Sequence, residues 1–506
     1  MKIKHLILTI IAFTFLSCEN YLDVNEDPNN PTQNTITPDL LLAGGLHDPY
    51  NNIFPGSANR LGNAFMNNWG PNVNSFTGGF LDEFQLRITS NFYDIIWDNL
   101  YRDLGTFQLI LDNEEEIYDN HKAISRIMKS FYFQYLVDLY GDIPYTEALA
   151  GGENLTPTYD DETEIYRDLI SELDVALSEI ENSDSDDLSV GSEDIVYQGD
   201  LEMWRKFANT IKLRILLRQS ELALTDGETQ TYLNQQFNSL EKDFITENVV
   251  INPGYSNAED KQNPYYALYG FDTQGNTTTS RQFLTATDYA VKFLKGIETE
   301  NGVQTNIPDP RLGRIYEPIQ SGDLAGEILG VQQGADNTDT PPELSKLGDG
   351  LIISSEQDGY LMMASESYFL QAEAAFRGYI PGDAKMLFQN GIIESYNLLG
   401  LTTAQADSYI NQSNSVNLIG WDGSQNKIEA IMTQKWIALN GINGLESWIE
   451  YTRTGFPEIP LPITATRDSK PNRLLYPTSE FSTNSANVPQ QSTEDAFSTR
   501  IFWDVN

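Results

Sequence analysis

Cysteine is almost absent from this chain, which has only one, Cys18, among its 506 residues. A disulfide within the chain is therefore excluded, and stability has to come from packing and polar contacts. Histidine is nearly as scarce, with only His5, His47 and His121. So few histidines give no sign of a histidine-rich zinc cluster or a Ser–His–Asp triad, and no glycine-rich phosphate-binding loop is present. These absences disfavour the common metal-dependent, nucleophilic and nucleotide-binding enzymes.

Basic residues are scarce as well: 31 Lys and Arg stand against 73 Asp and Glu, which gives a net charge of −42. A surface this negative repels nucleic acid and anionic membranes. Long hydrophobic runs are also lacking, since the run from Leu6 to Leu16 is shorter than the roughly 20 residues that span a bilayer. The hydrophobic fraction is an ordinary 40%, so we predict a globular chain with a large core.

The start of the chain has the parts of a secretory signal peptide. A basic beginning is followed by the short apolar run and then by Ser17, a small residue suited to precede a cleavage site. Cys18 comes next, in the position where bacterial lipoproteins carry their lipid, although Phe15 stands where an aliphatic residue is usual. We predict a signal peptide at 1–17 and lipidation of Cys18; the alternative is an incidental cysteine in a cleaved leader.

A tether follows the cysteine. Residues 18–36 are polar and interrupted by prolines, with too little apolar surface to fold, and they are predicted to form a flexible linker. Thr37 and Pro38 then have the character of an N-cap and a first helical residue. We therefore place a single folded domain at 37–506.

Apolar residues recur at helical spacing along much of this domain, which predicts a mainly α-helical fold. The stripes lie within 93–111, 124–139, 166–180, 204–215, 286–294, 361–375, 386–398 and 428–439. We expect about four antiparallel helix pairs, similar to tetratricopeptide repeats but without a fixed period. Trp97, Trp204 and Trp436 lie on these stripes and are predicted to be core residues.

Long irregular stretches rich in Gly, Asn and Thr separate the helices. They cover roughly 44–90, 245–285, 297–357 and 455–506. Structureless segments of this length in a compact domain are usually functional or contain small strands of their own. We expect long loops with small hairpins here, and we look for the binding site among them.

Short motifs spread over nearly the whole chain resemble those of the SusD/RagB family, surface lipoproteins of Bacteroidetes that bind glycans. They are, in order, CENYLD (18–23), YLVDLYGDIPY (135–145), YD (159–160), GD (199–200), WRKFAN (204–209), DPRL (309–312), ESYFLQAEA (366–374), QKWIALN (434–440), ESW (446–448), RTG (453–455), RLLYP (473–477) and WD (503–504). No single match is specific, but their common order identifies the chain as similar to this family.

The resemblance implies a SusD-like fold and a glycan-binding protein without catalytic activity, cofactor or bound metal. Its expected partners are an oligosaccharide or polysaccharide, a SusC-like TonB-dependent transporter and, through the lipid anchor, the outer membrane; no nucleic acid is expected. The acidic composition favours a neutral glycan, for which a β-glucan such as laminarin is our hypothesis. Two alternatives stay open: a binder of peptides or other nutrients, as in the RagB branch, and a surface glycoside hydrolase.

Most of the matching motifs are expected to stabilise the fold. Gly141 permits a tight turn after a helix, and Pro144 prevents the helix from continuing. Glu373, Arg453 and Arg473 are charged residues among apolar neighbours, and we expect them to be paired. The ligand site should therefore lie in the loops.

A sugar site needs flat aromatic rings beside amides, carboxylates or an arginine. The segment 63–76 has this make-up, and its predicted ligand residues are Asn67, Asn68, Trp69, Asn72 and Phe76. Tyr266 and Tyr269, in the segment 263–272, form a second candidate, and the glycan platform of SusD-like proteins draws on loops from these two regions. For Trp69 the alternative is a buried loop anchor, and for the two tyrosines it is also a structural role.

The acidic segment 182–187 has a weak resemblance to a calcium-binding loop. Asp187 stands at the sixth position, where an EF-hand turn needs glycine, so we predict a solvated acidic loop instead.

Overall fold

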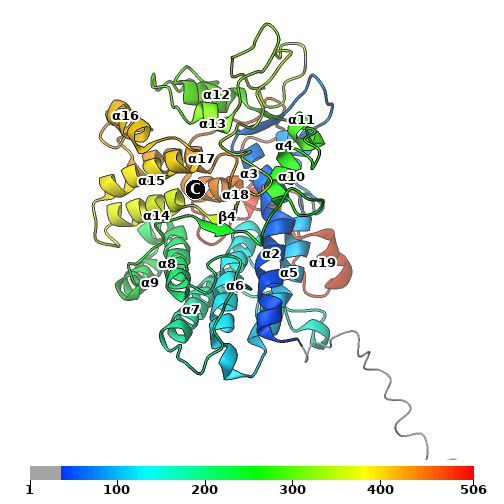
Figure 1. The fold of residues 1–506 in the computed structure, drawn as a ribbon, viewed down its shortest axis with the longest axis vertical. Helices are drawn as coiled ribbons and strands as arrows, with labels where there is room; N and C mark the ends of the chain where they lie inside the picture. The colour runs from blue at the N-terminus through cyan, green and yellow to red at the C-terminus, as the bar shows by residue number, and fades with distance from the viewer. Residues whose placement is uncertain (1–35) are drawn as a thin grey trace, which may run out of the picture.

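The computed structural model describes residues 36–506 as a mainly helical molecule with few strands (Figure 1). The predicted signal peptide (1–17), Cys18 and all but the last residue of the linker 18–36 lie outside the described residues. The predicted fold class, mainly α, is confirmed.

The longer helices are α2 (Pro38–Ile53), α5 (Ile95–Leu111), α6 (Asp119–Tyr140), α7 (Glu162–Glu181), α8 (Leu201–Arg218), α9 (Gly227–Ser239), α14 (Ala364–Phe376), α15 (Ala384–Leu398), α16 (Thr403–Ser413), α17 (Lys427–Leu439) and α18 (Gly444–Thr454). The shorter ones are α3 (Asn59–Phe65), α4 (Leu81–Gln85), α10 (Pro264–Tyr269), α11 (Thr279–Phe283), α12 (Asp288–Lys295), α13 (Leu312–Ile315), α19 (Thr478–Thr483) and α20 (Asp495–Ser498). The strands are β1 (Trp69–Pro71), β2 (Val249–Ile251), β3 (Leu284–Ala286) and β4 (Gly359–Met362).

Local sequence explains where several helices begin. Pro38 occupies the first turn of α2 after Thr37, as predicted, although the Thr37 side chain makes no capping hydrogen bond. The carboxylate of Asp161 accepts hydrogen bonds from the backbone N–H groups of Thr163 and Glu164 at the start of α7. Such caps satisfy donors that the first helical turn leaves free.

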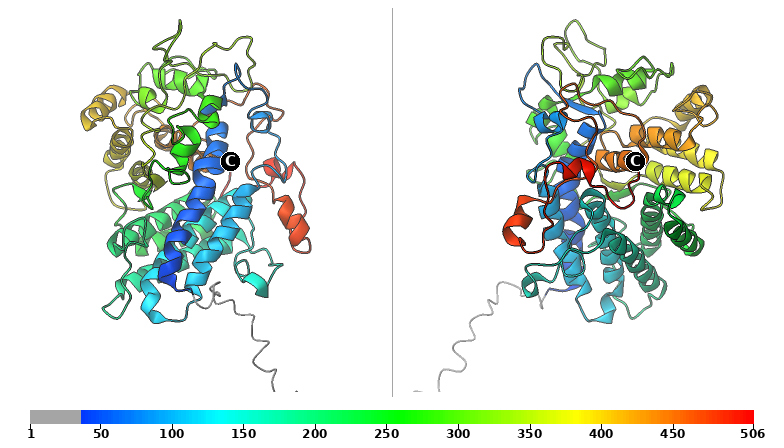
Figure 2. Two further views of the ribbon diagram at one scale, coloured as in Figure 1. Left: turned by 45° about the vertical axis from the view of Figure 1, so that its right-hand side comes forward. Right: turned by 180° about the vertical axis from the view of Figure 1, so that it is seen from behind.

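The predicted stripes form the core. Trp97, Trp204 and Trp436 are at most 3% exposed, so their assignment to the core is confirmed. Helix α2 packs on α5, α6 on α7, α14 on α15 and α17 on α18, and Figure 2 shows the lower helices as an array of neighbours. The tetratricopeptide-like character of these pairs stays a prediction.

The stretch 44–90 is more helical than its glycines and prolines predict. Helix α2 continues past Pro49 to Ile53 and is followed by a π-helical turn and by α3. Gly45 does not break the helix, because it faces α5: a Cβ atom there would lie 3.2 Å from the Phe107 ring. Gly45 suggested a loop in the sequence, but in the structure it permits close packing of α2 on α5.

Glycine has the same effect where α3 meets α18. A Cβ atom on Gly62 would lie 1.9 Å from the carbonyl carbon of Gly444, so the two backbones touch at this point. Asn59 of α3 fixes the contact, because its side-chain oxygen accepts a hydrogen bond from the Gly444 N–H at 3.1 Å. This contact attaches the N-terminal segment to the C-terminal helices.

The four strands join distant segments, while a small hairpin of the predicted kind lies at 270–278, where Phe271 pairs antiparallel with Thr277. β1 pairs antiparallel with β3, with Trp69 opposite Ala286, and β2 pairs antiparallel with β4. The first pair holds the segment after α3 against the segment after α11, and both border the cleft described below.

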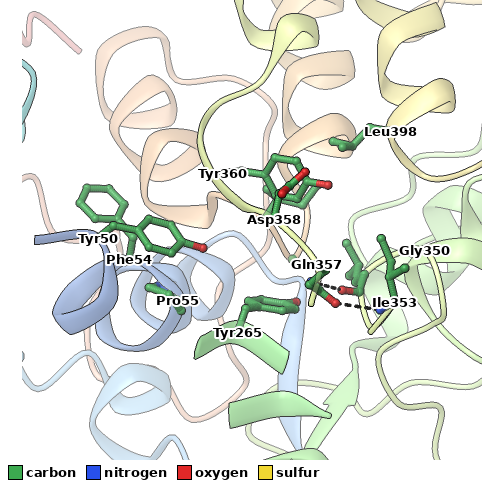
Figure 3. Close-up of a pocket in the computed structure, with 13 residues that line it drawn as sticks. Tyr50, Phe54, Pro55, Tyr265, Gly350, Ile353, Gln357, Asp358, Tyr360 and Leu398 are labelled. Carbon is green, nitrogen blue, oxygen red and sulfur yellow. Dashed lines mark hydrogen bonds between the residues drawn. The ribbon is translucent and has the colours of Figure 1, made fainter. Parts of the chain in front are cut away.

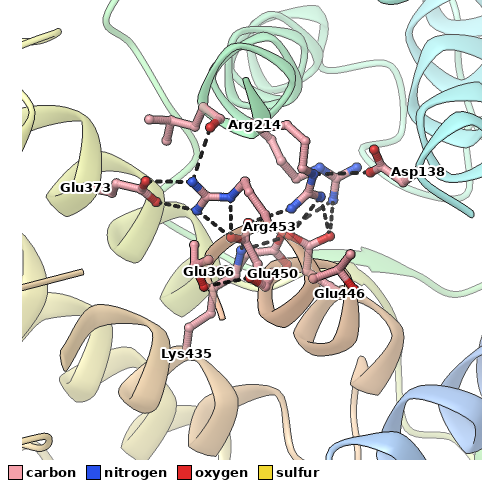
Figure 4. Close-up of polar contacts among 12 residues, drawn as sticks. Asp138, Arg214, Glu366, Glu373, Lys435, Glu446, Glu450 and Arg453 are labelled. Carbon is pink, nitrogen blue, oxygen red and sulfur yellow. Dashed lines mark hydrogen bonds and ion pairs between the residues drawn. The ribbon is translucent and has the colours of Figure 1, made fainter. Parts of the chain in front are cut away.

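A buried ion-pair network joins α6, α8, α14, α17 and α18 (Figure 4). Its members are all at most 3% exposed: Asp138, Arg214, Arg218, Glu366, Glu373, Lys435, Glu446, Glu450 and Arg453. Five carboxylates face four cations, so each charge has an opposite charge nearby, as buried ions require.

Arg453 is the centre of one half of this network. Its two terminal nitrogens donate to the two oxygens of Glu373 at 2.9 and 2.7 Å, and its Nε donates to Glu450 at 2.8 Å. The predicted pairing of Glu373 with Arg453 is therefore observed. Arg473 is different: it forms no ion pair with another described residue, and its guanidinium lies 4.8 Å from the centre of the Tyr476 ring.

Candidate functional site

An open cleft of about 1030 Å³ lies where α3, α4, α10 and α11 come together. Figure 1 shows these four helices at its upper right. Its lining comes from 56–60, 78–95, 268–269 and 280–284. These segments are far apart in the chain, and the β1–β3 pair brings the residues between 60 and 78 next to the end of 280–284. The irregular stretches of the sequence therefore build this site, as their length suggested.

Arg60 is the central polar residue of the cleft. Its guanidinium carbon lies 4.3 Å from the centre of the Phe80 ring and 5.5 Å from that of Phe283. Its Nη2 lies 3.5 Å from Oε1 of Glu83, and the Arg60 side chain is 38% exposed. The guanidinium is thus held over an aromatic ring, and the partly exposed side chain lines the cleft.

Glu83 connects Arg60 to Tyr93. The Tyr93 hydroxyl donates a hydrogen bond to Oε1 of Glu83 at 2.8 Å, and the Glu83 side chain is only 8% exposed. Burial, together with the negative charge of Glu83, raises the pKa of Tyr93 well above its ordinary value. Tyr93 therefore stays protonated and keeps Glu83 in place.

The backbone around the cleft is strained. Phe80, Leu86 and Tyr93 have φ angles of +57°, +54° and +56°, in the left-handed region that bulky residues avoid. Each costs about 1–2 kcal/mol relative to ordinary backbone. Phe80 and Leu86 bound α4 on both sides, so the strain is concentrated in the segment that positions Phe80 and Glu83. Because strained backbone clusters at functional sites, the strain in this segment supports a functional role for the cleft.

A second, narrow pocket lies between the end of α2, α10 and the loop before β4 (Figure 3). Tyr50, Phe54, Tyr265 and Tyr360 line it, but its volume is only about 20 Å³, enough for a water molecule. Gln357 closes it by accepting from the Ile353 N–H at 2.9 Å and donating to the Leu351 carbonyl at 3.1 Å. The pocket is therefore too small for a sugar ring.

The acidic segment 182–187 borders a hollow of about 520 Å³ together with Glu116, Asp119 and Glu179. Within residues 36–506, no group of three or more His, Cys, Asp or Glu is arranged to hold a metal ion.

In the same part of the chain, no helix is both long and apolar enough to cross a membrane.

A family model named SusD-like and described as "Starch-binding associating with outer membrane" matches residues 28–477. The chain belongs to the SusD-like family. The comparison with curated proteins gives no match.

Several solved structures share the fold of this SusD-like chain. A chitin-binding SusD homologue from Flavobacterium johnsoniae is 24% identical, with a TM-score of 0.72 over 92% of this chain and 99% of the other. A SusD homologue from Parabacteroides distasonis is 19% identical, with a TM-score of 0.72 over 93% and 98%. A SusD-like protein from Bacteroides thetaiotaomicron is 23% identical, with a TM-score of 0.71 over 93% and 99%. At these identities the likeness shows the fold.

The structure brings the two predicted ligand segments of this SusD-like chain together. Trp69 packs edge-on against Tyr269, with ring centres 5.1 Å apart, and Tyr269 lies in the lining of the cleft. Trp69 itself has no exposed surface and is held in β1. In this conformation it presents no face to a ligand, so the alternative of a buried anchor describes it better than the predicted platform.

The predicted asparagines are mainly structural. Asn68 is fully buried and donates from its side chain to Asn63 at 3.0 Å, while Asn67 is 5% exposed with φ at +52°. Asn72 donates its backbone N–H to the Phe283 carbonyl at 2.7 Å. Asn67 and Asn68 are buried and also lie outside the lining of the cleft, which argues against direct contact with a glycan there, whereas the half-buried Asn72 stays a candidate.

The remaining predicted aromatics lie beside the cleft. Phe76 packs edge-on against Phe283 with ring centres 5.4 Å apart. Tyr266 is half-buried and contacts Phe271, with ring centres 6.2 Å apart, outside the cleft lining. A ligand role for these two stays a proposal.

Sequence reasoning missed the polar centre of the cleft, Arg60, Glu83 and Tyr93. Arg60 stood in a stretch interpreted as loop, and Tyr93 was assigned to the following helical stripe, which begins only at Ile95. One local signal was available: Phe76, Phe80 and Phe84 recur every four residues, and Phe80 and Phe84 stack on each other in the structure.

Proposed function

We propose that this chain is a cell-surface lipoprotein that binds oligosaccharides or polysaccharides in the cleft. The observation that carries the proposal is the composition of the cleft surface. The half-exposed Phe283 and Tyr93, with Leu81 and Ile95 at 44% and 46% exposure, offer apolar contact beside the exposed part of Arg60. Sugars present apolar C–H faces and polar hydroxyl groups, and this surface complements both.

The size of the cleft favours an oligomer. Its volume of about 1030 Å³ reaches the top of the roughly 300–1000 Å³ typical of small-molecule sites. Because the cleft is open, a chain of sugar residues can extend beyond it, whereas an enclosed pocket would select one small molecule.

The family description supports this function and a location at the outer membrane. The family description refers to starch binding and association with the outer membrane, and one structural relative is described as chitin-binding. We propose that lipid on Cys18 and the linker 18–36 hold the protein at the outer membrane, and that it delivers its glycan to a SusC-like TonB-dependent transporter. A neutral β-glucan such as laminarin is the proposed ligand.

We expect binding without turnover. Incubation of the purified protein with its best-bound polysaccharide should release no reducing ends. A steady release would instead support the glycoside hydrolase alternative.

The direct test is affinity electrophoresis of the purified protein in gels that contain single polysaccharides. Retardation by at least one glycan is expected, together with weaker retardation of Phe283→Ala, which removes an aromatic face from the cleft. Phe376→Ala is the matched control, because Phe376 is 47% exposed on α14, away from the cleft. Equal retardation of both folded variants would place the site elsewhere.

A further inference from the structure

Both cations in the lining of the cleft face a carboxylate. Arg60 Nη2 lies 3.5 Å from Glu83, and Nε of Arg87 donates to Asp82 at 2.8 Å. The lining has no lysine. The positive charge of the cleft is thus already balanced before a ligand arrives.

The carboxylates exceed the cations. Asp82, Glu83 and Asp94 line the cleft against Arg60 and Arg87, which leaves three negative charges against two positive ones. The chain as a whole carries −42. An anionic ligand would therefore approach a negative site on a negative molecule.

Arg60 still has unused hydrogen-bonding capacity. It donates no hydrogen bond to any described residue at normal distance, and its nearest carboxylate oxygen is at 3.5 Å. Glu83, beside it, already accepts from Tyr93 and offers further lone pairs. A partly exposed donor and a charged acceptor thus lie next to each other, held by contacts with the Phe80 ring and the Tyr93 hydroxyl.

We infer that the cleft selects uncharged glycans, and that Arg60 and Glu83 together bind two neighbouring hydroxyl groups of one sugar residue. One hydroxyl oxygen accepts from Arg60, and the adjacent hydroxyl donates to Glu83. This inference rests on the proposed glycan-binding function and specifies its ligand class.

A charged sugar fits this pair poorly. A carboxylate or sulfate group offers acceptors only, so it could satisfy Arg60 but would face Glu83 as a like charge. Because Glu83 is only 8% exposed, water screens that repulsion weakly. A neutral hydroxyl pair satisfies both residues without this cost.

The first experiment compares uncharged and anionic polysaccharides by affinity electrophoresis of the full mature protein. Laminarin, starch and glycol chitin are the uncharged probes; alginate and polygalacturonate are the anionic ones. We expect at least one uncharged probe to retard the protein equally at low and high sodium chloride, and neither anionic probe to do so. Stronger retardation by alginate or polygalacturonate would overturn the inference while leaving glycan binding intact. If no probe of either kind binds, the proposed function itself fails, and the inference with it.

The second experiment uses Arg60→Met and Glu83→Gln. Hydrogen bonds to charged groups contribute enough that each variant should bind the best uncharged glycan roughly tenfold to a hundredfold more weakly. Glu83→Gln keeps the shape of the side chain but removes its charge, so its retardation by polygalacturonate should increase. A purely structural role for Glu83 would produce no such gain.

Arg167→Met is the matched control, since the Arg167 guanidinium also lies on an aromatic ring, 3.9 Å from the centre of Tyr232, but on α7. It should bind the glycan as the unmodified protein does. Unchanged affinity of both cleft variants for the uncharged glycan, at unchanged melting temperature, would overturn the inference.

Discussion

At the scale of single residues, Trp69 differs most between the role predicted from the sequence and the position found in the structure. Its ring is fully buried and packs edge-on against Tyr269, and its backbone pairs with Ala286 through β1. Since Tyr269 lines the cleft and Trp69 does not, Trp69 belongs to the packing behind the site and not to its surface.

We predict that Trp69→Ala destabilises the protein by about 3–5 kcal/mol, as expected for a buried large aromatic residue. Loss of glycan binding should follow only from unfolding. Denaturant titration of the free energy of unfolding, beside affinity electrophoresis, measures both effects.

Trp69→Phe is the control for this prediction. The Trp69 Nε1 has no hydrogen-bond partner among the described residues, so its removal leaves no group unpaired. Phe should therefore restore most of the stability. A stable Trp69→Ala protein with strongly weakened binding would return Trp69 to the role of a platform.

The buried network offers a second prediction for a single residue. Arg453→Met leaves Glu373 and Glu450 without their nearest cation, and both carboxylates are at most 3% exposed. Breaking a buried pair in this way costs about 3–5 kcal/mol. Thermal and denaturant unfolding should both show the loss.

An exposed pair serves as the comparison. Arg467 and Glu494 lie 2.5 Å apart but are 34% and 61% exposed. Arg467→Met should change the free energy of unfolding by no more than about 1 kcal/mol. Similar losses in the two variants would mean that burial does not determine the strength of these pairs.

The role of a residue could be predicted where it lay on a periodic apolar stripe, and it could not be predicted elsewhere. Trp97, Trp204 and Trp436 lay on helical stripes and are buried as expected. Trp69 lies in a strand of three residues, which is too short to show alternation, and the ring that covers it belongs to a distant helix. Arg60 was missed for the same reason, because Phe283 and Glu83 are its neighbours only in the folded chain.

At the scale of elements, the close contact of α3 with α18 determines how the N-terminal segment sits on the C-terminal helices. Gly62→Ala would place a Cβ atom 1.9 Å from the Gly444 carbonyl carbon, so one helix has to move. We expect a loss at or above the upper end of the roughly 1–3 kcal/mol typical of overpacked cores. The free energy of unfolding measures it.

At Gly105 we expect the same substitution to have the opposite effect on stability. It lies within α5, and a Cβ atom there would meet nothing within 4 Å. Gly105→Ala should therefore stabilise the protein by roughly 0.5–1 kcal/mol through helix propensity. If Gly62→Ala proved equally harmless, the backbone contact between α3 and α18 would be wrong.

Many of the long helices were predictable, although α9, α16 and α18 were missed, whereas the short helices of the cleft were not predictable. Helices α5 to α8 have enough turns for an apolar stripe to be visible in the sequence. Helices α3, α4, α10 and α11 have five to seven residues each, too few for a stripe, and α4 is bounded by strained Phe80 and Leu86. These short helices build the cleft, which explains why its region could be predicted but its residues could not.

On the scale of the whole molecule, the surface and the interior differ in net charge. The network holds five carboxylates against four cations, so nearly all of the excess of 73 acidic over 31 basic residues is carried by the rest of the chain, mainly its exterior. Such a surface keeps the protein away from anionic lipid. Attachment to a membrane then needs a separate anchor, for which Cys18 is the predicted residue.

We predict that Cys18→Ala moves the protein from the membrane fraction to the soluble fraction and abolishes its labelling with palmitate. The physical reason is that residues 36–506 contain no helix able to cross a membrane, and their acidic surface gives no attraction to anionic lipid. Fractionation of cells that express either form, with palmitate labelling, checks it. Ser17→Ala keeps a small residue before the cleavage site and should change neither result. Labelling that survives Cys18→Ala would show that lipid is attached elsewhere, and a labelled but soluble protein would show that the lipid alone does not hold it.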